Sequence, residues 1–210
     1  VGMATALGAK FLDSSGNVLP SGGAALARLD HIDITAMMET TSGVEIVGAT
    51  DVTNPLCGPT GASEIFGPQK GATKEVVAEL DAALGNFAEV VKRDLGVDVM
   101  DVPGAGAAGG LGAGLIAFAG GKLRSGIDMV CEVLEFDRHL EGADLVFTGE
   151  GRADKSTVFD KAPVGVARHA KAHGVPSILL AGSLGEGHEE LYDHDIASIL
   201  CISDGVMTFK

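Results

Sequence analysis

The 210-residue sequence has no tryptophan and a single tyrosine, and aromatic residues make up only 4% of it. Few side chains are therefore available to stack on nucleic-acid bases. Cationic residues are also scarce, because 15 Lys and Arg face 29 Asp and Glu for a net charge of −14. Such a field repels nucleic acid and anionic lipid. We expect neither nucleic acid nor a membrane as a partner.

Cysteines and long apolar runs are equally sparse. Cys57, Cys131 and Cys201 lie far apart, and their spacing matches neither a metal site nor a disulfide framework. The longest apolar run, residues 111–119, is far shorter than the ~20 residues that span a bilayer. These features predict a cytoplasmic protein. Because the sequence opens on Val1 and ends abruptly, we also expect it to be part of a longer chain.

Helix and strand patterns alternate along the sequence. Apolar residues at steps of three and four predict a helix over 73–95, with Thr73 as N-cap and Gly96 as C-cap. Strands are predicted over 44–52 and 97–102, and a helix over 126–140.

The last third of the sequence has a more regular alternation of predicted strands and helices. Three apolar strands are predicted, separated by two helices, and this alternation is typical of a parallel sheet wound with helices. The strands cover 144–148, 176–181 and 196–202, and the helices 162–173 and 187–192. We therefore predict an α/β protein of two α/β domains, divided near Gly142.

Gly104, Gly106 and Gly109 match the dinucleotide-binding fingerprint G-x-G-x-x-G, placed after a predicted strand and before a predicted helix. The fingerprint also needs an acidic residue at the end of a second strand ~20 residues on, but residues 126–136 have helical spacing. Phosphate contact through free backbone N–H groups and simple close packing of small residues both remain open.

Two other segments carry charged residues in constrained places. Lys70 lies between two glycine turns, where its ammonium is suited to a phosphate or is simply solvated. Glu150, Arg152 and Asp154 alternate just after a predicted buried strand, where ligands bind in open α/β sheets. Arginine grips carboxylates or phosphates, and the two acids suit Mg²⁺ or proton transfer; a solvated charged loop is the alternative.

Four segments in this order closely resemble the bacterial glycerate kinases of the glycerate 2-kinase family: DVTNPLCGP at 51–59, FGPQKGA at 66–72, PGAGAAGG at 103–110 and GEGR at 149–152. The resemblance implies ATP- and Mg²⁺-dependent phosphorylation of D-glycerate, at the 2-hydroxyl, in a cleft between two domains. Residues 1–142 would be most of the inserted second domain, a mixed α/β unit. Residues 143–210 would be an incomplete part of the Rossmann-like first domain, and segments of the family that line the cleft are absent here.

From the positions of these residues in the matching motifs, we infer a role for each. We expect catalytic roles for Asp154 and Asp51, and substrate contacts from Arg152 and Asn54. Mg²⁺ would be held by Glu150 and Asp154. Phosphate contacts would come from Lys70, Gly104, Gly106 and Lys161. Near Lys161 the sequence departs from the family, since Ser156 and Asp160 stand where it usually has Gln and Gly.

Two other functions stay open at this point. One is an oxidoreductase that binds a dinucleotide at the Gly104, Gly106 and Gly109 turn, and the other is a sugar-acid-binding fragment without catalysis. The expected partners are glycerate and ATP, and a homo-oligomer is open. The sequence does not separate 2- from 3-phosphorylation. We expect the isolated 210-residue chain not to phosphorylate glycerate.

Overall fold

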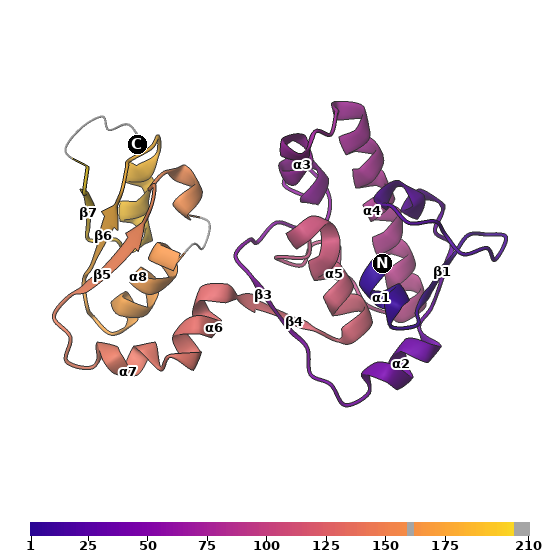
Figure 1. The fold of residues 1–210 in the computed structure, drawn as a ribbon, viewed down its shortest axis with the longest axis horizontal. Helices are drawn as coiled ribbons and strands as arrows, with labels where there is room; N and C mark the ends of the chain where they lie inside the picture. The colour runs from indigo at the N-terminus through magenta and orange to yellow at the C-terminus, as the bar shows by residue number, and fades with distance from the viewer. Residues whose placement is uncertain (159–161, 204–210) are drawn as a thin grey trace, which may run out of the picture. The chain divides into compact units, whose positions relative to one another are not determined.

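The computed structural model describes residues 1–158 and 162–203, and divides the chain into two compact units, Val1–Arg124 and Ser125–Lys210 (Figure 1). Both units mix helices with strands, which confirms the α/β class. No described helix is long and apolar enough to cross a membrane. Lys161, one of the expected phosphate ligands, lies outside the described residues.

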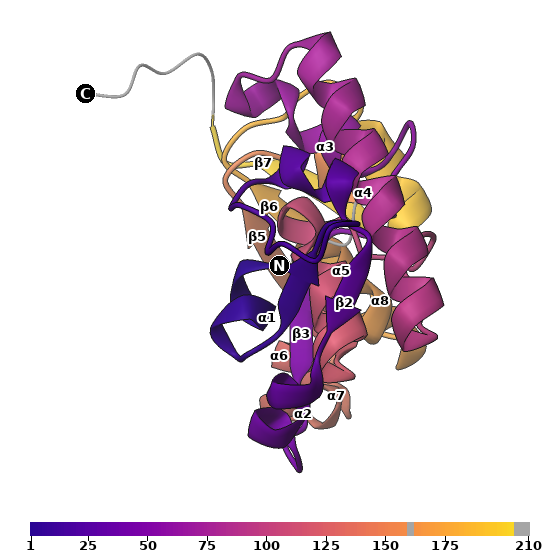
Figure 2. The same ribbon diagram turned by 90° about the vertical axis from the view of Figure 1, so that its right-hand side faces the viewer.

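The first unit combines two short strand pairs with helices. Strand β1 (Lys10–Leu12) pairs antiparallel with β2 (His31–Asp33), and β3 (Val47–Thr50) pairs with β4 (Lys122–Ser125). The helices are α1 (Gly2–Ala6), η1 (Gly23–Arg28), α2 (Thr35–Thr41), α3 (Ala62–Phe66), η2 (Pro68–Lys70), α4 (Lys74–Leu95) and α5 (Ala107–Ala119). Helix α4 passes beside η1 and β2 (Figure 2).

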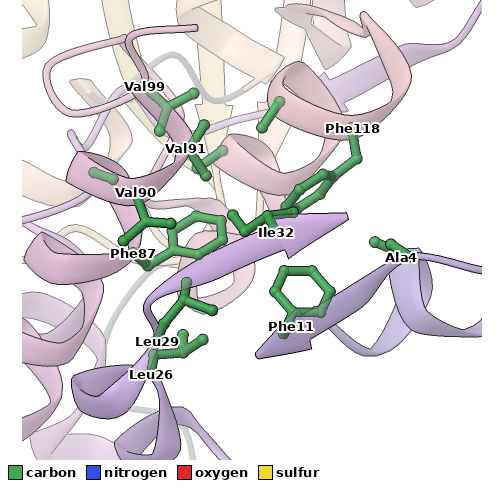
Figure 3. Close-up of a cluster of buried hydrophobic side chains, with 14 of the residues drawn as sticks. Ala4, Phe11, Leu26, Leu29, Ile32, Phe87, Val90, Val91, Val99 and Phe118 are labelled. Carbon is green, nitrogen blue, oxygen red and sulfur yellow. The ribbon is translucent and has the colours of Figure 1, made fainter. Parts of the chain in front are cut away.

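Helix α4 forms where the sequence predicts it. The Thr73 side chain accepts the Val76 N–H at the start, and Gly96 ends the helix with a left-handed backbone (φ 71°). Its buried face meets α5 through aromatic side chains, and α5 in turn meets β1. The ring of Phe118 lies 5.4 Å from that of Phe11, edge to face, and 6.0 Å from that of Phe87 (Figure 3). This cluster anchors the first unit.

Residues 97–102 form no strand, contrary to the sequence prediction. The carboxylate of Asp98 accepts the Met100 N–H and the Lys92 ammonium, so a local turn competes with strand pairing. The segment receives a backbone hydrogen bond from Leu56, whose N–H donates to Met100 O. The dinucleotide fingerprint requires a strand at this position, so the nicotinamide alternative loses its structural basis.

The second unit is a three-stranded parallel sheet with helices, as predicted. The order is β5 (Val146–Glu150), β6 (Ser177–Ala181), β7 (Ser198–Cys201), with Val146 opposite Ser177 and Ile178 opposite Ser198. Helix α8 (Ala162–Ala172) packs on β5 and β6. The remaining elements are α6 (Gly126–Val133), α7 (Phe136–Leu140), η3 (Lys155–Val158) and η4 (His188–His194).

Residues 126–140 form two helices instead of the single predicted one. The chain turns at Glu135, which takes a left-handed backbone (φ 51°) and lets both α6 and α7 pack on α8. These contacts place α6 and α7 in the second unit. The units therefore divide between Arg124 and Ser125, earlier than the boundary expected near Gly142.

Candidate functional site

The loop after β3 carries Asp51 and Asn54, and hydrogen bonds of Asn54 fix its conformation. The Asn54 amide Nδ2 donates to Thr60 O at 2.8 Å, and Asn54 O accepts the Gly106 N–H at 3.0 Å. The structure therefore brings Asn54 and the glycine turn before α5 together, although 50 residues of sequence separate them. Asp51 is exposed at the start of the same loop.

The close approach of the loop requires glycine at the turn. A Cβ added to Gly106 would lie 2.3 Å from Pro55 O, and Gly104 has φ 85° with Thr50 and Leu123 side chains 3.1–3.2 Å from such a Cβ. No other residue fits this packing. Because the Gly106 N–H is already donated to Asn54, a phosphate bound here would need other N–H groups. For Gly106 the packing interpretation is therefore the better supported.

Asp81 on α4 holds the other end of this loop. Its carboxylate accepts the Gly58 N–H, at 3.1 Å and 3.3 Å to the two oxygens, and its carbonyl accepts the Cys57 thiol at 3.6 Å. Burial, followed by the negative charges of Asp81 and Asp101, raises the pKa of the Cys57 thiol to about 11. The raised pKa and the hydrogen bond to Asp81 O favour a packing role for Cys57.

Lys70 lies exposed at the end of η2, between two glycines. A Cβ at Gly67 would lie 2.4 Å from Ser63 O, and Gly71 has a left-handed backbone (φ 89°). The sequence predicts this constrained turn, and the structure confirms it. The ammonium is thus presented to solvent from a backbone with little freedom.

In the second unit, the alternating charges follow directly on β5. Glu150 is its last residue, and one of its carboxylate oxygens, Oε2, is buried. Arg152 Nε lies 3.4 Å from Asp154 Oδ2, with the Arg152 side chain 66% exposed and that of Asp154 27% exposed. The structure thereby places an exposed guanidinium beside a half-buried carboxylate at the carboxyl end of a parallel sheet.

A second loop, residues 182–187 after β6, runs beside this charged segment. Ser183 N–H donates to Gly151 O at 3.1 Å, Ala153 N–H donates to Ser183 O at 3.0 Å, and Gly185 N–H donates to Ala153 O at 2.7 Å. Ala153, fully buried, pairs in parallel with Leu184. The sheet pairing thus continues beyond the ends of both strands and fixes the backbone that carries Arg152 and Asp154.

Thr157 holds the same segment from the other side. Its hydroxyl oxygen accepts the Asp154 N–H at 3.2 Å, and its own N–H donates to Asp154 O at 2.9 Å. The side chain is fully buried. Sequence reasoning missed both Thr157 and the 182–187 loop. A usable signal was present, because Gly182, Gly185 and Gly187 directly follow a predicted strand of the same parallel sheet.

Glu150 and Asp154 could supply only part of the ligand shell of Mg²⁺. Within residues 1–158 and 162–203, no three His, Cys, Asp or Glu side chains gather as a metal site would require. Mg²⁺ in kinases is commonly held by one or two carboxylates, with substrate phosphates and water completing the shell. Glu150 and Asp154, four residues apart on the fixed segment, suit that arrangement.

Comparisons with known proteins identify the family of the chain. The profile of the glycerate kinase family matches residues 1–210. A glycerate 2-kinase of Escherichia coli K12 is 46% identical over 99% of this chain and 54% of its own length, and a glycerate kinase of Halalkalibacterium halodurans is 44% identical over the same shares.

A solved structure also resembles this chain. It comes from Salmonella typhimurium LT2, is provisionally described as glycerate kinase 2, and is 47% identical with a TM-score of 0.76. The alignment covers 96% of this chain and 52% of that one, so the chain spans about half the length of the relatives it matches. The chain therefore belongs to the glycerate kinase family.

Proposed function

We propose that the protein containing this chain transfers a phosphoryl group from ATP to D-glycerate, at the 2-hydroxyl, with Mg²⁺ as the metal. Family membership supports the activity. The observation that carries it in this chain is the Arg152–Asp154 pair, held at the carboxyl end of a parallel sheet. We also propose that the protein is cytoplasmic, because ATP is available there as the phosphoryl donor.

Arg152 is the proposed ligand of the glycerate carboxylate. Its guanidinium is exposed, always charged, and planar, so it can donate two parallel hydrogen bonds to a carboxylate. The ion pair with Asp154 limits the directions that the guanidinium can take. It would thus hold the substrate in one orientation with its hydroxyl near the carboxylates.

Asp154 and Glu150 are proposed to supply negative charge for Mg²⁺, and Asp154 is also the preferred base for the substrate hydroxyl. Phosphoryl transfer depends on positioning and charge neutralisation more than on covalent chemistry. When bound, Mg²⁺ would neutralise the phosphate charge. Asp51 is the second candidate for the base, because it is exposed on a loop fixed to the glycine turn.

Lys70 is proposed as a cation for the ATP phosphates, together with backbone groups at the Gly104 turn and the Lys161 side chain. Asn54 is proposed to contact substrate. Its side-chain amide already donates to Thr60 O, so its carbonyl Oδ1 is the atom we assign to the substrate hydroxyls.

An ADP-release assay on the full-length protein tests the activity. Glycerate should support turnover better than tartronate or hydroxypyruvate, and phosphorus NMR of the product should show 2-phosphoglycerate. A 3-phosphoglycerate product would overturn the regiochemistry and leave the kinase assignment intact. Glycerate binding without any ATP turnover would instead support a sugar-acid-binding protein. Size-exclusion chromatography of the same sample measures whether it is a homo-oligomer.

Two variants test the residue roles. Arg152→Lys keeps the charge but loses the planar fork, so the glycerate KM should rise much more than the ATP KM. Equal increases in both would contradict the carboxylate assignment. Asp154→Asn should lower kcat, and an unchanged kcat would remove Asp154 from the catalytic machinery.

A further inference from the structure

Gly185 lies closer to the Arg152–Asp154 pair than any residue with a side chain could. A Cβ added at Gly185 would lie 2.7 Å from Asp154 Cβ, 2.8 Å from Arg152 Nε and 3.0 Å from Arg152 Nη2. These separations are well inside normal contact between non-bonded heavy atoms, ~3.5–4.0 Å. The space beside residue 185 is therefore filled by the pair itself.

The two neighbours differ in how they can yield to an added Cβ. Asp154 Cβ is fixed to a backbone that Thr157 holds on one side, while Gly185 N–H donates to Ala153 O on the other. The Arg152 guanidinium is the end of a flexible side chain and can swing away. Swinging away breaks its 3.4 Å approach to Asp154 and changes the direction in which it meets a ligand.

We propose that Gly185 is a positioning residue for the phosphoryl-acceptor site, because its missing side chain lets Arg152 and Asp154 pack as a pair against the loop after β6. The role rests on the proposed function of that pair. Residue 185 acts through Arg152 and Asp154 and contacts no substrate. It sets the direction of the guanidinium, and through it the position of the bound carboxylate.

The test is steady-state kinetics of Gly185→Ala in the full-length protein. A misplacement of ~1 Å can cost ~100-fold in rate, so we expect the glycerate KM to rise at least ~10-fold with a lower kcat. The ATP KM should change less than ~2-fold. A Gly185→Ala enzyme with wild-type glycerate KM and kcat would overturn the inference.

Gly187→Ala is the matched control in the same loop. Gly187 has φ 76°, and an added Cβ would lie 2.8 Å from Lys155 Cβ, so this variant strains the loop without touching the pair. It should lower the thermal unfolding midpoint and leave the ratio of glycerate KM to ATP KM unchanged. If it reproduced the selective rise of Gly185→Ala, the effect would be loss of loop structure and the inference would be wrong.

A double-mutant cycle separates positioning from general destabilisation. In an Arg152→Ala background, adding Gly185→Ala should raise the glycerate KM much less than in wild type, because the guanidinium it displaces is gone. Equal effects in both backgrounds would refute action through Arg152.

A compensating exchange covers the outcome in which Gly185→Ala unfolds the loop. Asp154→Gly with Gly185→Ala removes the Cβ that the new methyl group meets at 2.7 Å, so the double variant should fold as Asp154→Gly does. Failure to recover folding would refute the packing argument. Absence of kinase activity in wild type would refute the proposed function and not this packing, which the folding exchange tests independently.

Discussion

His169 on α8 should make the second unit more stable in mildly acidic than in alkaline solution. Its Nδ1 lies 2.7 Å from Asp137 Oδ1 on α7, and its Nε2 lies 3.1 Å from Asp128 Oδ1 on α6. A neutral imidazole has one N–H, so only the protonated ring donates both hydrogen bonds. The same carboxylates also meet Arg168 Nη2 at 2.5 Å and His173 Nε2 at 3.6 Å.

The direction of the pH effect follows from the pKa shifts. Burial alone would lower the pKa of His169, but the hydrogen bonds to Asp137 and Asp128 outweigh it and raise the pKa. Burial would likewise raise the pKa of Asp128, but Arg168 and His169 outweigh it and lower the pKa. The His169 contribution is therefore complete below its unfolded pKa of ~6.5 and is lost as pH rises through the higher folded value.

The size of the effect follows from the two hydrogen bonds. A hydrogen bond to a charged group contributes about 1.5–3 kcal/mol, but the Asp137 and Asp128 side chains are 57% and 38% exposed and partly screened by water. We expect a total of about 1–2 kcal/mol, well below the sum of two full bonds. His169→Gln, which carries no charge, should lose this pH-dependent part.

Urea unfolding at about pH 5.5 and 8.5 measures the difference, since these values lie on either side of the unfolded histidine pKa. Tyr192, the only tyrosine of the chain, lies on η4 and reports on the second unit by its fluorescence. His139→Gln, an exposed histidine on α7, is the matched control. If wild type and His169→Gln showed the same pH dependence, the two-carboxylate argument would be refuted.

Three further predictions concern Phe118, Asp81 and Cys57. Phe118→Ala should lower the free energy of unfolding by about 3–5 kcal/mol in urea titrations, because it empties the centre of the aromatic cluster; a loss below ~1 kcal/mol would contradict that packing. Asp81→Ala should lower the free energy of unfolding by about 1–3 kcal/mol, because it leaves the Gly58 N–H without its acceptor. Asp81→Asn should lower it less, because the side-chain carbonyl can still accept this N–H, and equal losses in the two variants would argue against the hydrogen bond. Iodoacetamide at mildly alkaline pH should modify exposed Cys201 before Cys57, as followed by peptide mass spectrometry, because the pKa of Cys57 is raised to about 11; the reverse order would refute the shift.

Local signals in the sequence predict part of this fold. Helix α4 and its two caps follow from side-chain periodicity, a threonine and a glycine, all within one segment. The three strands of the parallel sheet follow from short apolar runs, and Arg152 and Asp154 come directly after the first of them, at the edge where open α/β sheets commonly bind ligands. In each case, the information lies within a few residues of the element it defines.

Features that depend on distant partners could not be predicted in this way. Residues 97–102 have the composition of a strand, but the Asp98 carboxylate accepts the Met100 N–H, and no strand among the described residues pairs with this segment. The break at Glu135 serves the packing of α6 and α7 on α8, which lies some thirty residues further along. Gly185 supports the candidate site through contacts with Arg152 and Asp154 that only the folded sheet creates.

The pairing of 151–155 with 182–186 bears on which insertions the chain can accept. Surface loops usually tolerate extra residues. Here Lys155 N–H donates to Glu186 O and Gly182 N–H donates to Glu150 O, so both ends of the paired loops are fixed in register. A single residue inserted between them would shift the pairing by one and turn Arg152 and Asp154 toward the opposite side. These two loops should therefore tolerate insertions and deletions as poorly as the strands they follow.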